Sequence, residues 1–205
     1  MILAFDTSSA ACTAALFDGA GACLGQVDEM IGRGHAERLL PMIAELLNGR
    51  APRDILVGVG PGSFTGIRVA IAAAHGLAIG WGAELRGMSS LALLAAGAND
   101  DDDDDVAAAV TGGHGELFVQ QFDAASLAPT SPLLNLPPAD AAHAIRSELV
   151  VGSGAAQLVA ARGWGEAREL WPSAANALRL STSQRALAPR PVYARAPDAR
   201  VPEAA

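Results

Sequence analysis

The sequence predicts an α/β protein of two lobes, and three observations support this fold class. Short apolar runs typical of strands alternate with segments that have helical spacing. The chain has 205 residues and is 51% hydrophobic, which suffices for two small cores. An acidic run, Asp100–Asp105, interrupts it near the middle. We therefore predict a first lobe at residues 1–98, an acidic loop at 99–105, a smaller lobe at 106–188 and a tail at 189–205.

Three strands are expected at the start of the first lobe. Ile2–Phe5 is an apolar run that ends at polar residues. Thr13–Phe17 is closed by the turn signal Asp18-Gly19, and Ala22–Val27 follows it. This short spacing suits three consecutive antiparallel strands.

Helices and strands then alternate to the end of the first lobe. Pro41 lies inside the first helical pattern and is expected to kink or open that helix. The segments are a helix at His35–Asn48, a strand at Ile55–Val59, a helix at Ile67–Gly80, a strand at Glu84–Met88 and a helix at Ser90–Ala98. The order β-β-β-α-β-α-β-α is the half-unit of the two-lobed actin/sugar-kinase/Hsp70-type (ribonuclease H-like) fold. We therefore predict mixed sheets flanked by helices, with a reduced second lobe.

The second lobe is expected to contain fewer elements. They are strands at Val106–Val110 and Leu117–Phe122, a helix at Ala139–Leu149, a strand at Val150-Val151 and a helix at Ala155–Ala161. The acidic run cannot bury apolar area and repels itself, so we expect a solvated loop or inter-lobe hinge. Residues 189–205 are rich in Pro, Arg and Ala, which predicts an irregular surface tail.

Charge and cysteine content narrow the possible functions. The formal net charge is −8, and six of the acids form the single run. A protein that binds nucleic acid alone needs a basic surface, so any RNA contacts are expected to come from another chain. Cys12 and Cys23 lack CxxC spacing and are predicted to be reduced core thiols.

The hydrophobic pattern predicts a cytoplasmic protein without a membrane segment. The chain runs from Met1 directly into a strand, which is unlike a signal peptide. The longest apolar stretch, Val69–Ala83, is interrupted by His75 and is shorter than the roughly 20 residues that span a bilayer.

The most distinctive local feature is the glycine-rich loop Gly58–Gly66, between a predicted strand and a helix. Glycines permit close backbone approach, and free N–H groups at a helix start can bind an anion. The loop lacks the Gly-Lys-Ser/Thr ending of a Walker A loop, and Ser63 replaces the last glycine of the dinucleotide fingerprint. We favour the alternative, a tight turn in which Ser63 or Thr65 caps a buried helix.

Asp6 follows the first strand, where this fold class usually has a phosphate-facing loop. Its carboxylate could hold a metal or water, or it could tie down the adjacent turn, and the sequence leaves both interpretations open. The phosphate-loop-like candidates are Asp6, Thr7, Ser8, Gly60, Gly62, Ser63 and Gly66.

The sequence predicts no catalytic residues. The four histidines, at positions 35, 75, 114 and 143, include no pair at i, i+3 or i+4. Neither H-E-x-x-H nor G-x-S-x-G occurs. His75 stands among alanines, which favours a packed or interface residue over a general base. We expect no metal and no cofactor bound by this chain alone.

Four segments resemble the TsaB (YeaZ) family, a bacterial branch of the glycoprotease-like proteins. They are Ile2–Ser9, His35–Ile43 with its internal proline, Gly60–Arg68 continued by His75–Ala78, and Pro191–Arg195 as P-x-Y-x-R. The resemblance spans the chain and is specific mainly in the first lobe. The chain departs from the family at Thr111–His114, where an Asp-Ala-Arg-type segment is usual.

The resemblance implies a function in making N6-threonylcarbamoyladenosine, next to the anticodon of tRNAs that read codons starting with adenine. In that family the chain binds and activates a catalytic relative, TsaD, and a small ATPase, TsaE, joins the complex. The resemblance also implies a homodimer when the chain is alone, contact with tRNA only through the complex, and ATP and metal held by the partners.

The resemblance places the partner interface on the first two helices. Each helix alone could be core, but a four-helix contact with a similar lobe would bury their outward apolar residues. The predicted interface residues are His35, Leu39, Leu40, Ile43, Leu47, Arg68, Ile71, His75 and Ile79.

The resemblance also implies a non-catalytic subunit. The catalytic relative has a metal-binding H-x-x-x-H pair whose positions correspond to Ser90 and Leu94 here, and leucine offers no donor atom. Two alternatives remain open. One is an ATP-dependent phosphotransferase or ATPase of the same fold class that uses Asp6 and the glycine-rich loop. The other is a glycoprotease-like peptidase.

Overall fold

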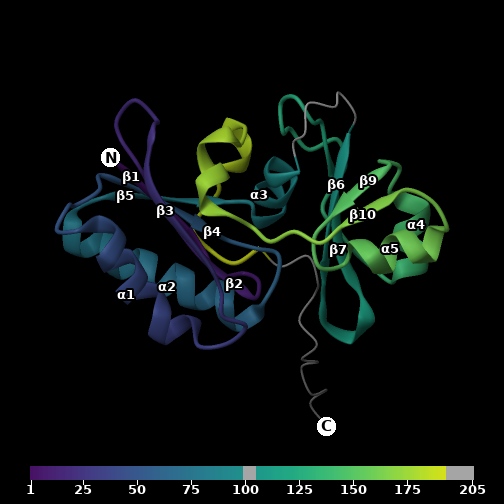
Figure 1. Cartoon of the computed structure of the whole chain (residues 1–205), viewed down its shortest axis with the longest axis horizontal. Coiled ribbons are helices and arrows are strands. Elements are labelled where there is room, and N and C mark those ends of the chain that lie inside the picture. Colours follow the sequence, from purple (N-terminus) through teal and green to yellow (C-terminus); the bar gives the residue numbers. More distant parts are fainter. Residues whose placement is uncertain (99–104, 193–205) are drawn as a thin grey trace, which may run out of the picture.

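The computed structural model describes residues 1–98 and 105–192 and contains two five-stranded sheets, one in each half of the molecule (Figure 1). The first sheet has the order β3-β2-β1-β4-β5. Its strands are β1 (Ile2–Asp6), β2 (Ala11–Phe17), β3 (Cys23–Met30), β4 (Asp54–Gly58) and β5 (Glu84–Met88). The central strand β1 is antiparallel to β2 and parallel to β4, so the carboxyl ends of β1 and β4 lie at the same edge.

Two helices, α1 (His35–Leu47) and α2 (Phe64–Trp81), lie side by side on one face of the first sheet (Figure 1). Alternation along β1 divides its side chains between two cores: Leu3 and Phe5 pack beneath these helices, whereas Ala4 faces the opposite side. With α3 (Ser90–Gly97), the predicted element order of the first lobe is confirmed. Pro41 lies inside α1, which is not divided there.

The second sheet has the order β10-β9-β6-β7-β8. Its strands are β6 (Val106–Thr111), β7 (Leu117–Phe122), β8 (Leu134–Leu136), β9 (Leu149–Val151) and β10 (Glu166–Arg168). The helices α4 (Pro138–Ala144) and α5 (Ala155–Arg162) pack against each other and against this sheet. The predicted two-lobed α/β architecture is confirmed, and the helices of the second lobe, with 7 and 8 residues, are shorter than α1 and α2.

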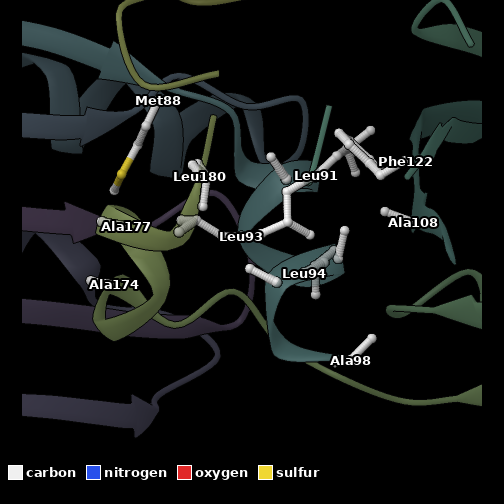
Figure 2. Close-up of a cluster of buried hydrophobic side chains, with 14 of the residues drawn as sticks. Met88, Leu91, Leu93, Leu94, Ala98, Ala108, Phe122, Ala174, Ala177 and Leu180 are labelled. Atoms are coloured by element: carbon white, nitrogen blue, oxygen red, sulfur yellow. The ribbon is translucent and has the colours of Figure 1, made fainter. Parts of the chain in front are cut away.

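The helix α3 connects the cores of the two halves. Its leucines lie between the first sheet with the 3-10 helix η2 (Ala174–Arg179) on one side and the second sheet on the other (Figure 2). The buried residues labelled there are Met88, Leu91, Leu93, Leu94, Ala98, Ala108, Phe122, Ala174, Ala177 and Leu180. One continuous apolar cluster therefore joins the lobes.

After the second sheet the chain returns to the first lobe. The hydroxyl of Ser173 donates to the carboxylate of Asp28, and the backbone N–H of Ala174 donates to Thr13 Oγ1 (2.8 Å). Further along, Leu187 exchanges two backbone hydrogen bonds with Gly87 on β5. The sequence predicts that residues 106–188 form the second lobe. It does not predict that Ser173, Ala174 and Leu187 bond to the first lobe.

The second lobe differs from the sequence prediction in its short elements. The helix expected at Ala139–Leu149 ends at Ala144, because the side-chain oxygen of Gln121 accepts the backbone N–H groups of Arg146 and Ser147. The 3-10 helices η1 (Gly113–Gly115) and η3 (Thr182–Gln184) and the strands β8 and β10 were not expected, since three residues are too few to show a period. Most of the predicted acidic loop and tail, residues 99–104 and 193–205, lies outside the described residues.

Helix α2 is longer than the sequence predicted. It begins at Phe64 and has 18 residues, and by length and composition it is the single helix in the described ranges that could cross a membrane. Its inner residues Ile67, Ala70 and Ala74 are buried in the core shared with α1 and the first sheet. Helix α2 therefore packs as a helix that covers one face of the first sheet.

The two cysteines differ in environment. Cys12 on β2 is buried with its Sγ 3.9 Å from Met42 Sδ, whereas Cys23 at the start of β3 is exposed. The prediction of a core thiol is therefore wrong for Cys23. Both are free thiols. Burial raises the pKa of the Cys12 thiol to about 11, because the thiolate is poorly solvated there.

We expect iodoacetamide at about pH 8 to label Cys23 and to leave Cys12 unmodified. Roughly one Cys12 thiol in a thousand is ionised at that pH, and the side chain is closed to solvent. Peptide mass spectrometry measures the labelling. Guanidinium unfolding should equalise the two sites, and Cys23→Ser should abolish native-state labelling. Equal rates in the folded protein would contradict the buried position of Cys12.

Candidate functional site

The two predicted loop segments meet at one edge of the first sheet. They follow β1 and β4, which are parallel neighbours whose carboxyl ends lie together. The backbone N–H of Ser63 donates to the carbonyl oxygen of Ser8 (2.6 Å). Thr7 Oγ1 donates to the carbonyl oxygen of Gly66 in the first turn of α2 (2.7 Å). The structure thus brings the phosphate-loop-like candidates together in one place, which we call the loop junction: residues 6–8 and 58–66.

Asp6 is the one fully buried charged residue in the part of the chain that the structure describes. One carboxylate oxygen accepts the backbone N–H of Ser8 (2.6 Å), and the other accepts the hydroxyl of Ser90 (2.5 Å). Ser90 Oγ accepts the N–H of Gly60 (3.1 Å), and the Ser90 N–H donates to the Gly60 carbonyl (3.1 Å). Asp6 is therefore held by one donor from its own loop and one from α3, and Ser90 links it to Gly60.

Three glycines of the loop lie too close to residues 6–8 to carry a side chain. A Cβ at Gly58 would overlap the carboxylate of Asp6. One at Gly62 would overlap the carbonyl oxygen of Ser8, and one at Gly66 that of Thr7. These glycines are required for contact within the protein, and the contact closes residues 6–8 to solvent.

This geometry favours a tight turn over an anion-binding loop. The Ser63 hydroxyl caps α2 by accepting the backbone N–H of Gly66 (3.2 Å). Asp6 ties down the adjacent turn and is 0% exposed, so its carboxylate does not reach solvent. Within residues 1–98 and 105–192, no three His, Cys, Asp or Glu side chains gather in a way that could hold a metal ion.

Three large apolar side chains on α1 and α2 are exposed. Ile79 is 84% exposed, Phe64 67% and Leu40 47%. Between the helices lies a groove of about 460 Å³, lined by Ala36, Leu39, Leu40, Val69, Ala72, Ala73, Gly76 and Leu77. We call the groove and these three exposed residues the α1–α2 face. Exposed apolar side chains beside an apolar groove are typical of protein interaction sites.

Only part of the predicted interface lies on this face. Four of its residues are at most 8% exposed and belong to the core beneath the helices: Leu39, Ile43, Leu47 and Ile71. They occupy the helix positions that point toward the sheet. The prediction is therefore wrong for these four as exposed contact residues, although Leu39 also borders the groove. Leu40, Arg68, His75 and Ile79 are exposed, and His35 is partly exposed.

The start of α2 presents an arginine stacked on an aromatic ring. The guanidinium carbon of Arg68 lies 3.3 Å from the ring centroid of Phe64, and Arg68 also donates to the Phe64 carbonyl oxygen (3.1 Å). Further along, His75 Nε2 lies 3.3 Å from the carbonyl oxygen of Pro189. Aromatic and arginine side chains are enriched in interfaces. The sequence prediction missed Phe64, although its position four residues before Arg68 could have identified it.

An ion-pair network fixes α1 to the edge strand β3. Arg38 donates to both carboxylate oxygens of Glu29 (2.7 and 2.6 Å) and to Glu45 (3.1 Å). The hydrogen bonds from Arg38 hold the pKa of Glu29 below its usual range. The position of α1, and with it the groove, therefore depends on β3 as well as on the apolar core.

Comparison with known proteins identifies the family. A family model described as TsaD, tRNA N6-adenosine threonylcarbamoyltransferase, matches residues 22–128. The Escherichia coli tRNA threonylcarbamoyladenosine biosynthesis protein TsaB is 41% identical over 105 residues. A Pseudomonas aeruginosa crystal structure, described as similar to peptidase YEAZ, matches with a TM-score of 0.78 and 31% identity, over 95% of this chain and 99% of that one. The chain belongs to the TsaB (YeaZ) family.

Further TsaB relatives support this assignment. YeaZ from Pseudomonas aeruginosa matches with a TM-score of 0.76 at 29% identity, over 94% of this chain and 98% of that one. The Haemophilus influenzae TsaB is 40% identical over 102 residues. The chain spans less than half the length of the curated TsaB proteins it matches: 47% of this chain aligns with 43% of the E. coli protein and 42% of the H. influenzae protein.

The structure gives a physical role to one of the segments that resemble the TsaB family. Gly60–Arg68 forms most of the loop junction and the first turn of α2. Ser90 and Leu94, the two positions that the resemblance compares with a metal-binding pair, are each 1% exposed. Ser90 bonds to Asp6, and Leu94 packs in the inter-lobe core. Both side chains are thus used inside the protein.

Two glycines of α2 allow a matched test of the loop junction. We expect Gly66→Ala to destabilise the protein by more than about 2 kcal/mol, because its Cβ would overlap the Thr7 carbonyl. Gly76→Ala should stabilise it by about 0.5–1 kcal/mol, because a Cβ there meets nothing within 4 Å and alanine is the better helix former. Urea unfolding measures both. Equal effects would contradict the packing described.

Proposed function

We propose that this chain is the non-catalytic subunit of the machinery that forms N6-threonylcarbamoyladenosine next to the anticodon of tRNAs reading codons that start with adenine. It binds a TsaD-type catalytic chain through the α1–α2 face and activates it. The carrying observation is that three of the five large apolar side chains exposed in the first lobe, Leu40, Phe64 and Ile79, lie on α1 and α2 beside an apolar groove, while residues 6–8 are closed to solvent. The TsaB relatives, named as biosynthesis proteins of this nucleoside, support the choice of pathway.

The chemistry of the α1–α2 face fits a helical partner. The groove lining carries no charged side chain, and its small residues Ala72, Ala73 and Gly76 leave space for a large apolar side chain from outside. Leu40 and Ile79 would lose their contact with water in the same event. Two helices of a similar lobe packed across this face would make a four-helix contact.

The chain has further partners besides the catalytic chain. Copies of the chain pair through the same face when the catalytic chain is absent, so the two complexes compete. A TsaE-type ATPase joins the assembly, and ATP and metal belong to the partners. With a net charge of −8, the chain meets tRNA only through the complex, which works in the cytoplasm.

Reconstitution tests the function directly. The chain alone should transfer no threonylcarbamoyl group to tRNA, and its addition to TsaD-type and TsaE-type proteins should restore modification, measured as the modified nucleoside by mass spectrometry. Full modification without this chain would refute the activating role.

The docking surface has a matched control. Leu40→Asp and Ile79→Asp should each weaken binding of the TsaD-type chain at least about thirtyfold, because an unpaired carboxylate would be desolvated in the contact. Leu24 is the matched control because it is 45% exposed, close to the value for Leu40. It lies on β3, outside the α1–α2 face, so Leu24→Asp should leave binding unchanged. Calorimetry measures the affinities. If the control weakens binding as much, the surface is misassigned.

An ATP-dependent phosphotransferase of the same fold class is the second candidate. It requires Asp6 and the glycine loop to reach a nucleotide, and these residues are buried against each other. Calorimetry of the isolated chain with ATP and Mg²⁺ should give no binding heat, and a tight complex would revive this candidate. A peptidase has less support, because the described residues gather no metal-ligand cluster and the sequence has no G-x-S-x-G.

A further inference from the structure

A continuous set of hydrogen bonds leads from the first turn of α2 to α3. The first turn is bonded to Thr7, and the residue that caps it, Ser63, is bonded to Ser8. Asp6 precedes these residues on β1 and accepts the hydroxyl of Ser90, the first residue of α3. The start of α2 is thereby attached to a helix that is itself held in the inter-lobe core.

Ser90 connects Asp6 with the loop that precedes α2. Its hydroxyl donates to Asp6 and accepts from Gly60, and its own N–H returns a bond to the Gly60 carbonyl. No salt bridge reaches Asp6 from residues 1–98 or 105–192, so its buried carboxylate depends on the donors Ser8 and Ser90. A buried carboxylate that loses a donor will move or recruit water, because an unsatisfied charge is costly in the interior.

Such a movement would act on one end of α2. Gly60 and Ser63 both lie in the segment that sets where the helix begins. Phe64 and Arg68 follow within the first turns, and they form the exposed aromatic–arginine pair. The other end of α2 leads directly into β5, which pairs with β4 and whose Glu84 N–H donates to the Arg53 carbonyl (2.9 Å). Ile79 should therefore keep its position.

We propose that Asp6 and Ser90 are positioning residues of the α1–α2 face. They fix the start of α2, and the affinity for the catalytic chain depends on them through the placement of Phe64 and Arg68. This inference rests on the proposed function and adds a buried determinant that touches no partner. It also gives the buried Asp6 carboxylate a function beyond holding its own turn.

The experiment compares Ser90→Ala with Leu94→Ala. Both residues are 1% exposed on α3, but Leu94 contributes only apolar contacts to the inter-lobe core. Urea unfolding first establishes the stability of each variant. Amide hydrogen exchange of the isolated chain and calorimetric binding to the TsaD-type chain are then measured at a temperature where both variants are folded. Asp6→Asn serves as a second variant, because the amide keeps the shape and one acceptor.

Ser90→Ala is expected to raise exchange across residues 60–68 at least about tenfold and to weaken partner binding at least about tenfold. Leu94→Ala is expected to change both by less than about twofold there, despite a comparable loss of stability. Because Asp6 and Ser90 act as a unit, the effects of Asp6→Asn and Ser90→Ala on binding should be less than additive.

The outcomes separate this inference from the proposed function. If the wild-type chain does not bind the catalytic chain, the proposed function fails and the inference fails with it. If the wild-type chain binds and Ser90→Ala binds equally well, the inference alone fails. Equal changes in Ser90→Ala and Leu94→Ala would also overturn it, because the effect would then follow overall stability.

Discussion

Three glycines between the end of β4 and the first turn of α2 press their backbone against residues 6–8, and Asp6 closes the same contact through its bonds to Ser8 and Ser90. This contact sets the distance between the central strand and α2. Protein interiors tolerate few voids, so a side chain at any of these glycines would have to push strand and helix apart. The groove between α1 and α2, the first turn of α2 and the attachment of α3 all depend on this spacing.

The first lobe separates its polar and apolar features. Asp6, Thr7, Ser8 and Ser90 make hydrogen bonds within the protein at the carboxyl edge of the sheet and are withdrawn from solvent, whereas apolar groups on the outer side of the helices remain in contact with it. This arrangement agrees with the association proposed above.

The element order of the first lobe could be predicted because its strands are long enough, and its helices periodic enough, to be identified locally. The facing of the helices could not. Leu39 and Leu40 are adjacent and equally apolar, so the pattern alone does not say which one points toward the sheet. In α2 almost every position is apolar or small, and periodicity marks no inner side.

Contacts between residues distant in sequence could not be predicted either. The loop junction requires Ser8 to meet Gly62, and the end of α4 requires Gln121 to reach Arg146. Neither pairing leaves a local signal in the chain. The same holds for Cys23, which belongs to an apolar-looking segment that forms an exposed edge strand.

The polypeptide passes between the two halves twice, once after α3 and again before Ser173, where it comes back to bond with Asp28 and Thr13. A fragment that stops at residue 98 would thus leave Thr13 without the Ala174 amide and one side of the first sheet stripped of η2. Expressing the first lobe by itself would require grafting residues 173–192 onto it, and a circular permutant that joins these segments is the natural design.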